Sequence, residues 1–139
     1  MRTVSRMRAS EALASRPLIL VVDDTESLRG ILARAFLRTG YHVITASGAA
    51  HALGLLDQLE ARPDLAVIDL YMPVVSGEEL AADLSHRHPG LPFLFLSAFG
   101  HGPDAVLPGL LLEKPFRLEV LCRIVAHALE TGSQVAIAR

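Results

Sequence analysis

The chain has 139 residues, of which 51% are hydrophobic and 20% are charged, a composition typical of one folded domain and not of a disordered segment. Its formal net charge of −2 leaves no surplus of cations for coating nucleic acid or an anionic membrane, so neither is an expected partner. The chain has one cysteine and no apolar run long enough for a membrane helix or a secretory signal, so we expect a cytoplasmic protein.

The first half of the chain alternates short apolar runs with segments of helical period. Each run, such as LILVV, is the pattern of a strand that is buried on both faces of a parallel sheet. The elements predicted here are, in chain order, a strand at 18–22, a helix at 25–39, a strand at 41–46, a helix from Ser47 to about Glu60 and a strand at 65–69. Gly40 follows the first helix as a C-terminal glycine does, and Ser47 can cap the second. Residues 1–16 are expected to form an N-terminal arm.

The second half continues the alternation but contains one short connection. The elements predicted here are a helix at 76–87, strands at 93–97 and 109–113, a helix at 117–130 and a loose tail at 131–139. Ser76 and Glu79 have the spacing of a capping box at the start of the first of these helices. The eleven residues between Ser97 and Gly109 include two glycines and two prolines, so we expect the fourth helix to be shortened or missing.

Apolar residues at helical spacing predict which side of each helix packs against the sheet. The predicted inner residues are Leu28, Ile31, Leu32, Ala35 and Phe36 in the first helix, Ala49, Ala52, Leu53 and Leu56 in the second, and Leu118, Leu121, Val125, Ala128 and Leu129 in the last. Arg29, Arg34 and Arg38 lie off the first of these faces, and we interpret them as solvated surface. The pattern predicts one α/β domain over residues 17–130, with a parallel sheet covered by helices on both faces.

Ionisable and polar side chains collect at the carboxyl ends of the predicted strands, where open α/β sheets bind ligands. Asp23 and Asp24 follow the first strand and Asp69 ends the third. Ser97 ends the fourth strand, and Lys114, the only lysine of the chain, follows the fifth. Three carboxylates in one crevice repel one another unless a cation joins them, and oxygen ligands of this kind suit Mg²⁺. The set predicts a phosphoryl-transfer site in which a carboxylate attacks phosphorus while a metal ion and Lys114 neutralise the charge.

Four stretches of the chain resemble, in this order, the signatures of response-regulator receiver domains. They are VVDD (21–24), VIDLYMPVVSG (67–77), FLS (95–97) and EKPF (113–116). The resemblance covers about residues 17–130. It implies a doubly wound five-stranded parallel sheet of the flavodoxin/CheY-like kind, with the strand order 2-1-3-4-5.

The resemblance gives Asp69 and the acids after the first strand distinct roles. It implies that Asp69 accepts the phosphoryl group and also binds Mg²⁺. Asp24 matches the residue that binds the metal directly, and Asp23 matches the residue that binds it through a water molecule. The main-chain carbonyl of Tyr71 completes the implied protein ligands of the metal.

The remaining matches concern the fourth and fifth strands. Ser97 matches the switch Ser/Thr of receivers, and Lys114 matches the lysine that contacts phosphate. The family resemblance also implies a cis peptide bond between Lys114 and Pro115. PFLFLSAFG (92–100) is similar to the signature of the FAT GUY receivers, in which the fourth helix is missing or poorly ordered. Leu111 occupies a position where many receivers carry a switch Tyr or Phe, so the usual coupling between hydroxyl and aromatic residue is in question here.

The resemblance also implies how long the phosphoryl group lasts. In receivers the residues two positions after the acceptor and two positions after the switch residue flank the path of the attacking water. Here these residues are Tyr71 and Phe99. Two aromatic rings leave the water without a base or a polar anchor, so we expect a long-lived phosphate on Asp69.

The implied function is that of a stand-alone response regulator, because 139 residues leave no room for an output domain. It would accept a phosphoryl group from a sensor histidine kinase or a histidine phosphotransfer protein, and then bind a downstream protein target or act as a phosphate sink. Such a protein catalyses its own phosphorylation and slow dephosphorylation and is no conventional enzyme. Two alternatives stay open. One is a Mg²⁺-dependent phosphatase of the haloacid-dehalogenase type, which would place D-x-D after its first strand, and the other is a flavodoxin-like cofactor binder or a non-phosphorylated docking module.

Overall fold

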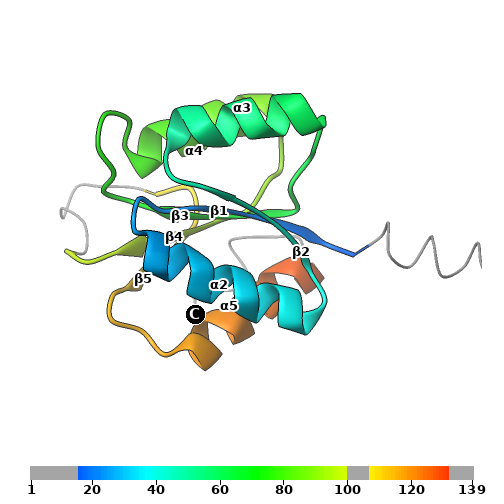
Figure 1. The fold of residues 1–139 in the computed structure, drawn as a ribbon, viewed down its shortest axis with the longest axis vertical. Coiled ribbons are helices and arrows are strands. Elements are labelled where there is room, and N and C mark those ends of the chain that lie inside the picture. The colour runs from blue at the N-terminus through cyan, green and yellow to red at the C-terminus, as the bar shows by residue number, and fades with distance from the viewer. Residues whose placement is uncertain (1–15, 100–106, 132–139) are drawn as a thin grey trace, which may run out of the picture.

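The computed structural model describes residues 16–99 and 107–131. Five strands form one sheet in the order β2-β1-β3-β4-β5, and all four neighbouring pairs are parallel (Figure 1). The strands are β1 (Leu18–Val22), β2 (His42–Ala46), β3 (Leu65–Asp69), β4 (Phe93–Ser97) and β5 (Leu110–Glu113). The predicted α/β class, the strand number and the order 2-1-3-4-5 are confirmed.

Four helices among the described residues cover the two faces of the sheet. They are α2 (Glu26–Thr39), α3 (Ala49–Leu59), α4 (Gly77–Arg87) and α5 (Leu118–Thr131). Figure 1 shows α3 and α4 on one face and α2 and α5 on the other. Each pair of helices encloses its own apolar cluster with the side chains of the sheet. None of the described helices has the length and apolarity needed to cross a membrane.

The central strands are apolar throughout because both of their faces are covered. In β1, Ile19 and Val21 pack in the cluster under α2 and α5, whereas Leu20 and Val22 pack in the cluster under α3 and α4. All four side chains are fully buried. Burying a side chain of this size stabilises the fold by about 1.5–3 kcal/mol, so a continuous apolar run is favoured in such a strand.

The helix ends confirm two predicted caps and correct one. Gly40 ends α2 at φ 106°, a left-handed conformation that glycine adopts without a steric penalty. Its N–H donates to the carbonyl of Leu37, and the N–H of Tyr41 donates to the carbonyl of Phe36. Ser76 and Glu79 form the predicted capping box at the start of α4.

The prediction for Ser47 was wrong, because α3 begins at Ala49 with Gly48 as its N-cap residue and without a side-chain cap. Ser47 instead donates its N–H to Nδ1 of His51 over 3.1 Å.

Three predictions fall wholly or partly outside the described residues. Of the N-terminal arm predicted at 1–16 only Arg16 is described, and of the tail predicted at 131–139 only Thr131, which ends α5. Most of the connection expected to hold a shortened fourth helix lies at 100–106, outside the described residues. The described parts of that connection, residues 98–99 and 107–109, contain no helix. At its end, a Cβ on Gly109 would lie 2.3 Å from the carbonyl oxygen of Phe93, so glycine allows the chain to enter β5 close against β4.

Two residues predicted to face the core lie at its rim. Ile31 and Leu118 are 44% and 38% exposed, although their spacing places them next to buried neighbours on α2 and α5. Both line a hollow between α2 and the segment after β5, together with Leu28 and Phe116. The prediction that Ile31 and Leu118 face the core was wrong, because helical spacing alone does not distinguish the centre of an apolar face from its edge.

Candidate functional site

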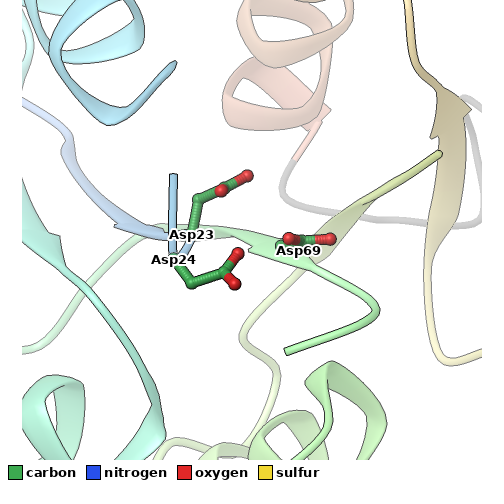
Figure 2. A group of neighbouring side chains, drawn as sticks. All are labelled: Asp23, Asp24 and Asp69. Atoms are coloured by element: carbon green, nitrogen blue, oxygen red, sulfur yellow. The ribbon is translucent and has the colours of Figure 1, made fainter. Parts of the chain in front are cut away.

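Three carboxylates meet at the carboxyl edge of the sheet. Asp23 and Asp24 directly follow β1, and Asp69 ends β3, the strand paired with β1 through Val22 and Ile68. One oxygen atom from each carboxylate lies within 4.8 Å of the other two. Figure 2 shows the three side chains side by side at the ends of these strands. The structure therefore brings together the three acids that the sequence placed in one crevice.

Asp23 is held in place at both carboxylate oxygens and is fully buried. Its Oδ1 accepts the N–H of Thr25 over 2.8 Å, and its Oδ2 accepts a hydrogen bond from Nζ of Lys114 over 3.2 Å. Its own N–H donates to the carbonyl of Ala46 at the end of β2. A buried carboxylate is tolerated only when its charge is paired and hydrogen-bonded, and Lys114 supplies the paired charge.

Asp69 is only 5% exposed, and its surroundings oppose its ionisation. Burial, the nearby charge of Asp23 and a hydrogen bond with the side chain of Asp24 raise its pKa to about 6, although the charge of Lys114 and the N–H of Tyr71 act against them. That N–H donates to Oδ1 of Asp69 over 3.3 Å. Because Asp69 is buried beside Asp23 and Asp24, a positive charge at this point would stabilise its ionised form.

Lys114, which directly follows β5, provides part of this charge. Its Nζ lies 3.2 Å from Oδ2 of Asp23 and 3.6 Å from Oδ2 of Asp69. The N–H of Lys114 donates to the carbonyl of Ser97 over 2.7 Å, which ties the end of β5 to the end of β4. The bond from Lys114 to Pro115 is cis, as expected. One ammonium therefore bridges the acids of two strands.

Ser97 and Phe99 form a tight turn beside the acids. Ser97 is fully buried, and its Oγ accepts the N–H of Phe99 over 3.1 Å. The ring of Phe99 contacts the ring of Tyr71 edge to face, with centroids 5.8 Å apart. Both rings are open to solvent, at 82% and 47% exposure. Leu111 is partly buried and packs against the cluster under α3 and α4.

The loop after Asp69 closes tightly against the start of α4. A Cβ on Gly77 would lie 2.5 Å from the carbonyl oxygen of Asp69, a separation that real Cβ atoms do not adopt, so only glycine fits here. The N–H of Gly77 donates to the carbonyl of Leu70 over 2.9 Å. Gly77 therefore lets the first turn of α4 press against the main chain of Asp69.

The structure also adds a residue that the sequence analysis did not assign to the site. Arg29 lies in the first turn of α2, and its Nη1 donates to the main-chain carbonyl of Asp23 over 2.7 Å. Its interpretation as solvated surface was wrong. The only signal in the sequence is its place in the first helical turn after Asp23 and Asp24, and that place alone does not predict a contact with a carbonyl.

The donor set fits a small divalent cation. Mg²⁺ binds oxygen ligands, uses few carboxylates and retains water molecules. Asp23, Asp24 and Asp69 offer carboxylate oxygens that lie close together, and burial together with the charge of Asp23 raises the pKa of Asp69, so a cation bound here would favour its ionised form.

Comparison with known proteins agrees with this geometry. A family model described as the response regulator receiver domain matches residues 19–126. Protein PetR of Rhodobacter capsulatus is 39% identical over 136 residues, which cover 86% of this chain and 54% of that protein. Sensor kinase CckA of Brucella abortus is 32% identical over 125 residues, which cover 85% of this chain and 13% of that protein. The chain therefore spans about half of the first of these relatives and a small part of the second.

Among solved structures, the response regulator protein TrrA from Thermotoga maritima in complex with Mg²⁺–BeF is similar in fold. The two chains share 26% sequence identity and superimpose with a TM-score of 0.70 over 80% of this chain and 97% of that one.

Proposed function

Because the chain belongs to the response regulator receiver domain family, we propose that it takes a phosphoryl group from a phospho-histidine onto Asp69 in a Mg²⁺-dependent reaction. Receiver domains of two-component systems are phosphorylated by sensor histidine kinases and use Mg²⁺ at an acidic site. The observation that carries the proposal is the convergence of three carboxylates within 4.8 Å under the ammonium of Lys114.

Each acid has a part in holding the metal in this proposal. Asp24 and Asp69 bind Mg²⁺ directly, Asp23 binds it through a water molecule, and the carbonyl of Tyr71 completes the protein ligands. The different surroundings of the acids support this division. Asp24 is exposed and can approach a hydrated ion, whereas both oxygens of Asp23 already accept hydrogen bonds from Thr25 and Lys114.

The transfer itself needs a nucleophile and positive charge. A carboxylate oxygen of Asp69 attacks phosphorus, the P–N bond to the donor imidazole breaks, and the ring nitrogen leaves with the electron pair of that bond. Bound Mg²⁺ supplies positive charge to the phosphoryl oxygens. Lys114 lies 3.6 Å from Asp69, so its ammonium can pair with one phosphoryl oxygen as the transfer proceeds. The hydroxyl group of Ser97 donates a hydrogen bond to another phosphoryl oxygen.

The biological setting forms a second part of the proposal. The phosphoryl donor is a sensor histidine kinase or a histidine phosphotransfer protein, and the phosphorylated receiver binds a downstream protein or serves as a phosphate sink. The receiver works in the cytoplasm as a free-standing protein. The mass of the native protein in extracts of its own cells tests the last point, because an attached output domain would increase that mass.

Incubation with a small-molecule phosphodonor, with and without Mg²⁺, tests the chemistry through the intact mass of the protein. The proposal predicts one added phosphoryl group in Mg²⁺, none in excess chelator and none in Asp69→Asn. A protein that releases inorganic phosphate continuously without accumulating an adduct would be a phosphatase. A protein that never gains the adduct would be a docking module, and both results would overturn the proposal.

A further inference from the structure

The main-chain carbonyl of Asp23 is fixed by a charged side chain from the next helix. Nη1 of Arg29 donates to this oxygen over 2.7 Å, a short distance typical of hydrogen bonds from charged donors. Asp23 lies at the point where the chain leaves β1 and turns towards α2. A bond at this oxygen acts on the turn itself and not only on one side chain.

Arg29 is one of several anchors of this turn. The N–H of Asp23 is bound to Ala46 of β2, and its carboxylate is bound to Thr25 and Lys114. The bond from Arg29 adds the first turn of α2 to these anchors. Asp24, which follows directly, is exposed, and its side chain shares a hydrogen bond with Asp69.

We propose that Arg29 is a positioning residue for the metal site, which keeps the main chain of Asp23 in place so that Asp23 and Asp24 present their carboxylates towards Asp69. The inference rests on the proposed Mg²⁺ site. Residues that orient metal ligands through hydrogen bonds are typically worth about 10- to 100-fold in metal affinity, and Arg29 acts on two ligands at once.

The charge of Arg29 and its hydrogen bond act on Mg²⁺ in opposite directions. A guanidinium near three carboxylates repels a divalent cation, so loss of the charge alone would tighten Mg²⁺ binding. Loss of the positioning bond would weaken it. The sign of the change in affinity therefore separates the two roles. Salt gives a second criterion, because a repulsion between partly exposed charges is screened at high ionic strength.

The test is isothermal titration of Mg²⁺ into the parent protein, Arg29→Ala, Arg29→Lys and the matched control Arg34→Ala. Arg34 is an exposed residue of the same helix. We expect Arg29→Ala to bind Mg²⁺ about tenfold more weakly than the parent at low and at high salt. Arg29→Lys should also bind Mg²⁺ more weakly than the parent, although it keeps the charge. Arg34→Ala should bind Mg²⁺ with the affinity of the parent. Affinity of Arg29→Ala within about twofold of the parent, or tighter, would overturn the proposal; if that variant does not fold, parent-like affinity of Arg29→Lys would do so.

A measurement without metal separates this inference from the proposed function. The N–H of Thr25 is bound to the side chain of Asp23, so it reports the order of the turn. We expect its hydrogen exchange in metal-free Arg29→Ala to be about tenfold faster than in the parent, with strand β1 unchanged. A parent protein that binds no Mg²⁺ would contradict the proposed metal site and leave this result standing. Unchanged exchange at Thr25 would contradict the positioning role of Arg29.

Discussion

Lys114 forms its shorter ion pair with Asp23 and not with the proposed acceptor Asp69. Its Nζ lies 3.2 Å from Oδ2 of Asp23 and 3.6 Å from Oδ2 of Asp69. Before phosphorylation the ammonium therefore compensates a fully buried acid, and it lies close enough to pair with an anion arriving at Asp69. One cation thus serves the stability of the resting protein as well as the proposed chemistry.

Lys114→Ala should destabilise the protein as well as impair its phosphorylation. The substitution leaves Asp23 buried without its paired charge, a loss that we expect to cost about 1–3 kcal/mol because water reaches the lysine in part. Urea unfolding measures the cost. Arg87→Ala is the control, since Arg87 pairs with Asp57 and Asp83 at the exposed surface and exposed pairs contribute little. Equal effects of the two substitutions would show that Lys114 does not compensate Asp23.

Asp69 should lower the stability of the metal-free protein at neutral pH. Its pKa is raised from 3.8 to about 6, so the folded state binds its proton more tightly than the unfolded state. The penalty is absent below the unfolded pKa, grows as the pH rises towards 6, and is constant above it. Asp69→Asn should therefore be more stable than the parent by roughly 2 kcal/mol at about pH 8, and by much less at about pH 4.

The comparison between the two proteins reports Asp69 together with the neighbouring groups that interact with its charge, because all more distant groups titrate alike in both. Denaturant unfolding at several pH values gives the difference. Saturating Mg²⁺ should remove most of it, since the cation then compensates the charge of Asp69. A difference that does not change between acid and neutral pH would contradict the raised pKa.

Gly77→Ala should damage the site through the main chain. The added Cβ would meet the carbonyl oxygen of Asp69 at 2.5 Å, and main-chain atoms cannot move aside without shifting the strand end. We expect a loss of stability of about 1–3 kcal/mol together with slower phosphorylation of Asp69. Gly54→Ala is the matched control, because no atom lies within 4 Å of its added Cβ in α3, and alanine stabilises a helix interior by about 0.5–1 kcal/mol. Equal behaviour of the two variants in thermal unfolding would contradict the steric account.

The aromatic pair should prolong the life of the phosphoryl group. The rings of Tyr71 and Phe99 contact each other with centroids 5.8 Å apart, so they can exclude a water molecule or leave it without a base. Phosphorylated Tyr71→Asn/Phe99→Glu should lose its phosphate about tenfold faster than the parent in Mg²⁺, since positioning a reactant is worth several kcal/mol. Val74→Asn changes a fully exposed residue of the same loop and should leave the decay unchanged. Decay of the double variant at the parental rate would refute the shielding by the two rings.

The sequence predicted the strands well because they are buried on both faces. A run such as LILVV leaves few alternatives, and the observed bounds of β1, β3 and β4 agree with the predicted ones. The three acids and Lys114 could be placed in one crevice for the same reason, since parallel strands end at the same edge of a sheet. Their distances could not be predicted, because these depend on the register of β1 against β3 and on side-chain rotamers.

The residues that were misjudged depend on how neighbouring elements meet, which the pattern of residue types does not show. Arg29 has the pattern of a polar helix face, and its bond to the carbonyl of Asp23 arises only from how α2 leaves β1. Ile31 and Leu118 continue apolar spacings, yet they line a hollow and stay partly exposed. Ser47 is a good capping residue, but α3 starts two residues after it with Gly48 as its N-cap.

The central claim is that Asp69 accepts the phosphoryl group, and chemical trapping of the acyl phosphate tests it most directly. The protein is incubated with a phospho-histidine donor or a small phosphodonor in Mg²⁺, reduced with borohydride and digested, and the peptides are sequenced by mass spectrometry. Reduction of an aspartyl phosphate gives homoserine, which marks the acceptor. The account predicts homoserine at position 69, none when Mg²⁺ is chelated, and none in Asp69→Asn. Homoserine at another aspartate of the parent protein, or a parent protein that remains unmodified with every donor, would contradict it.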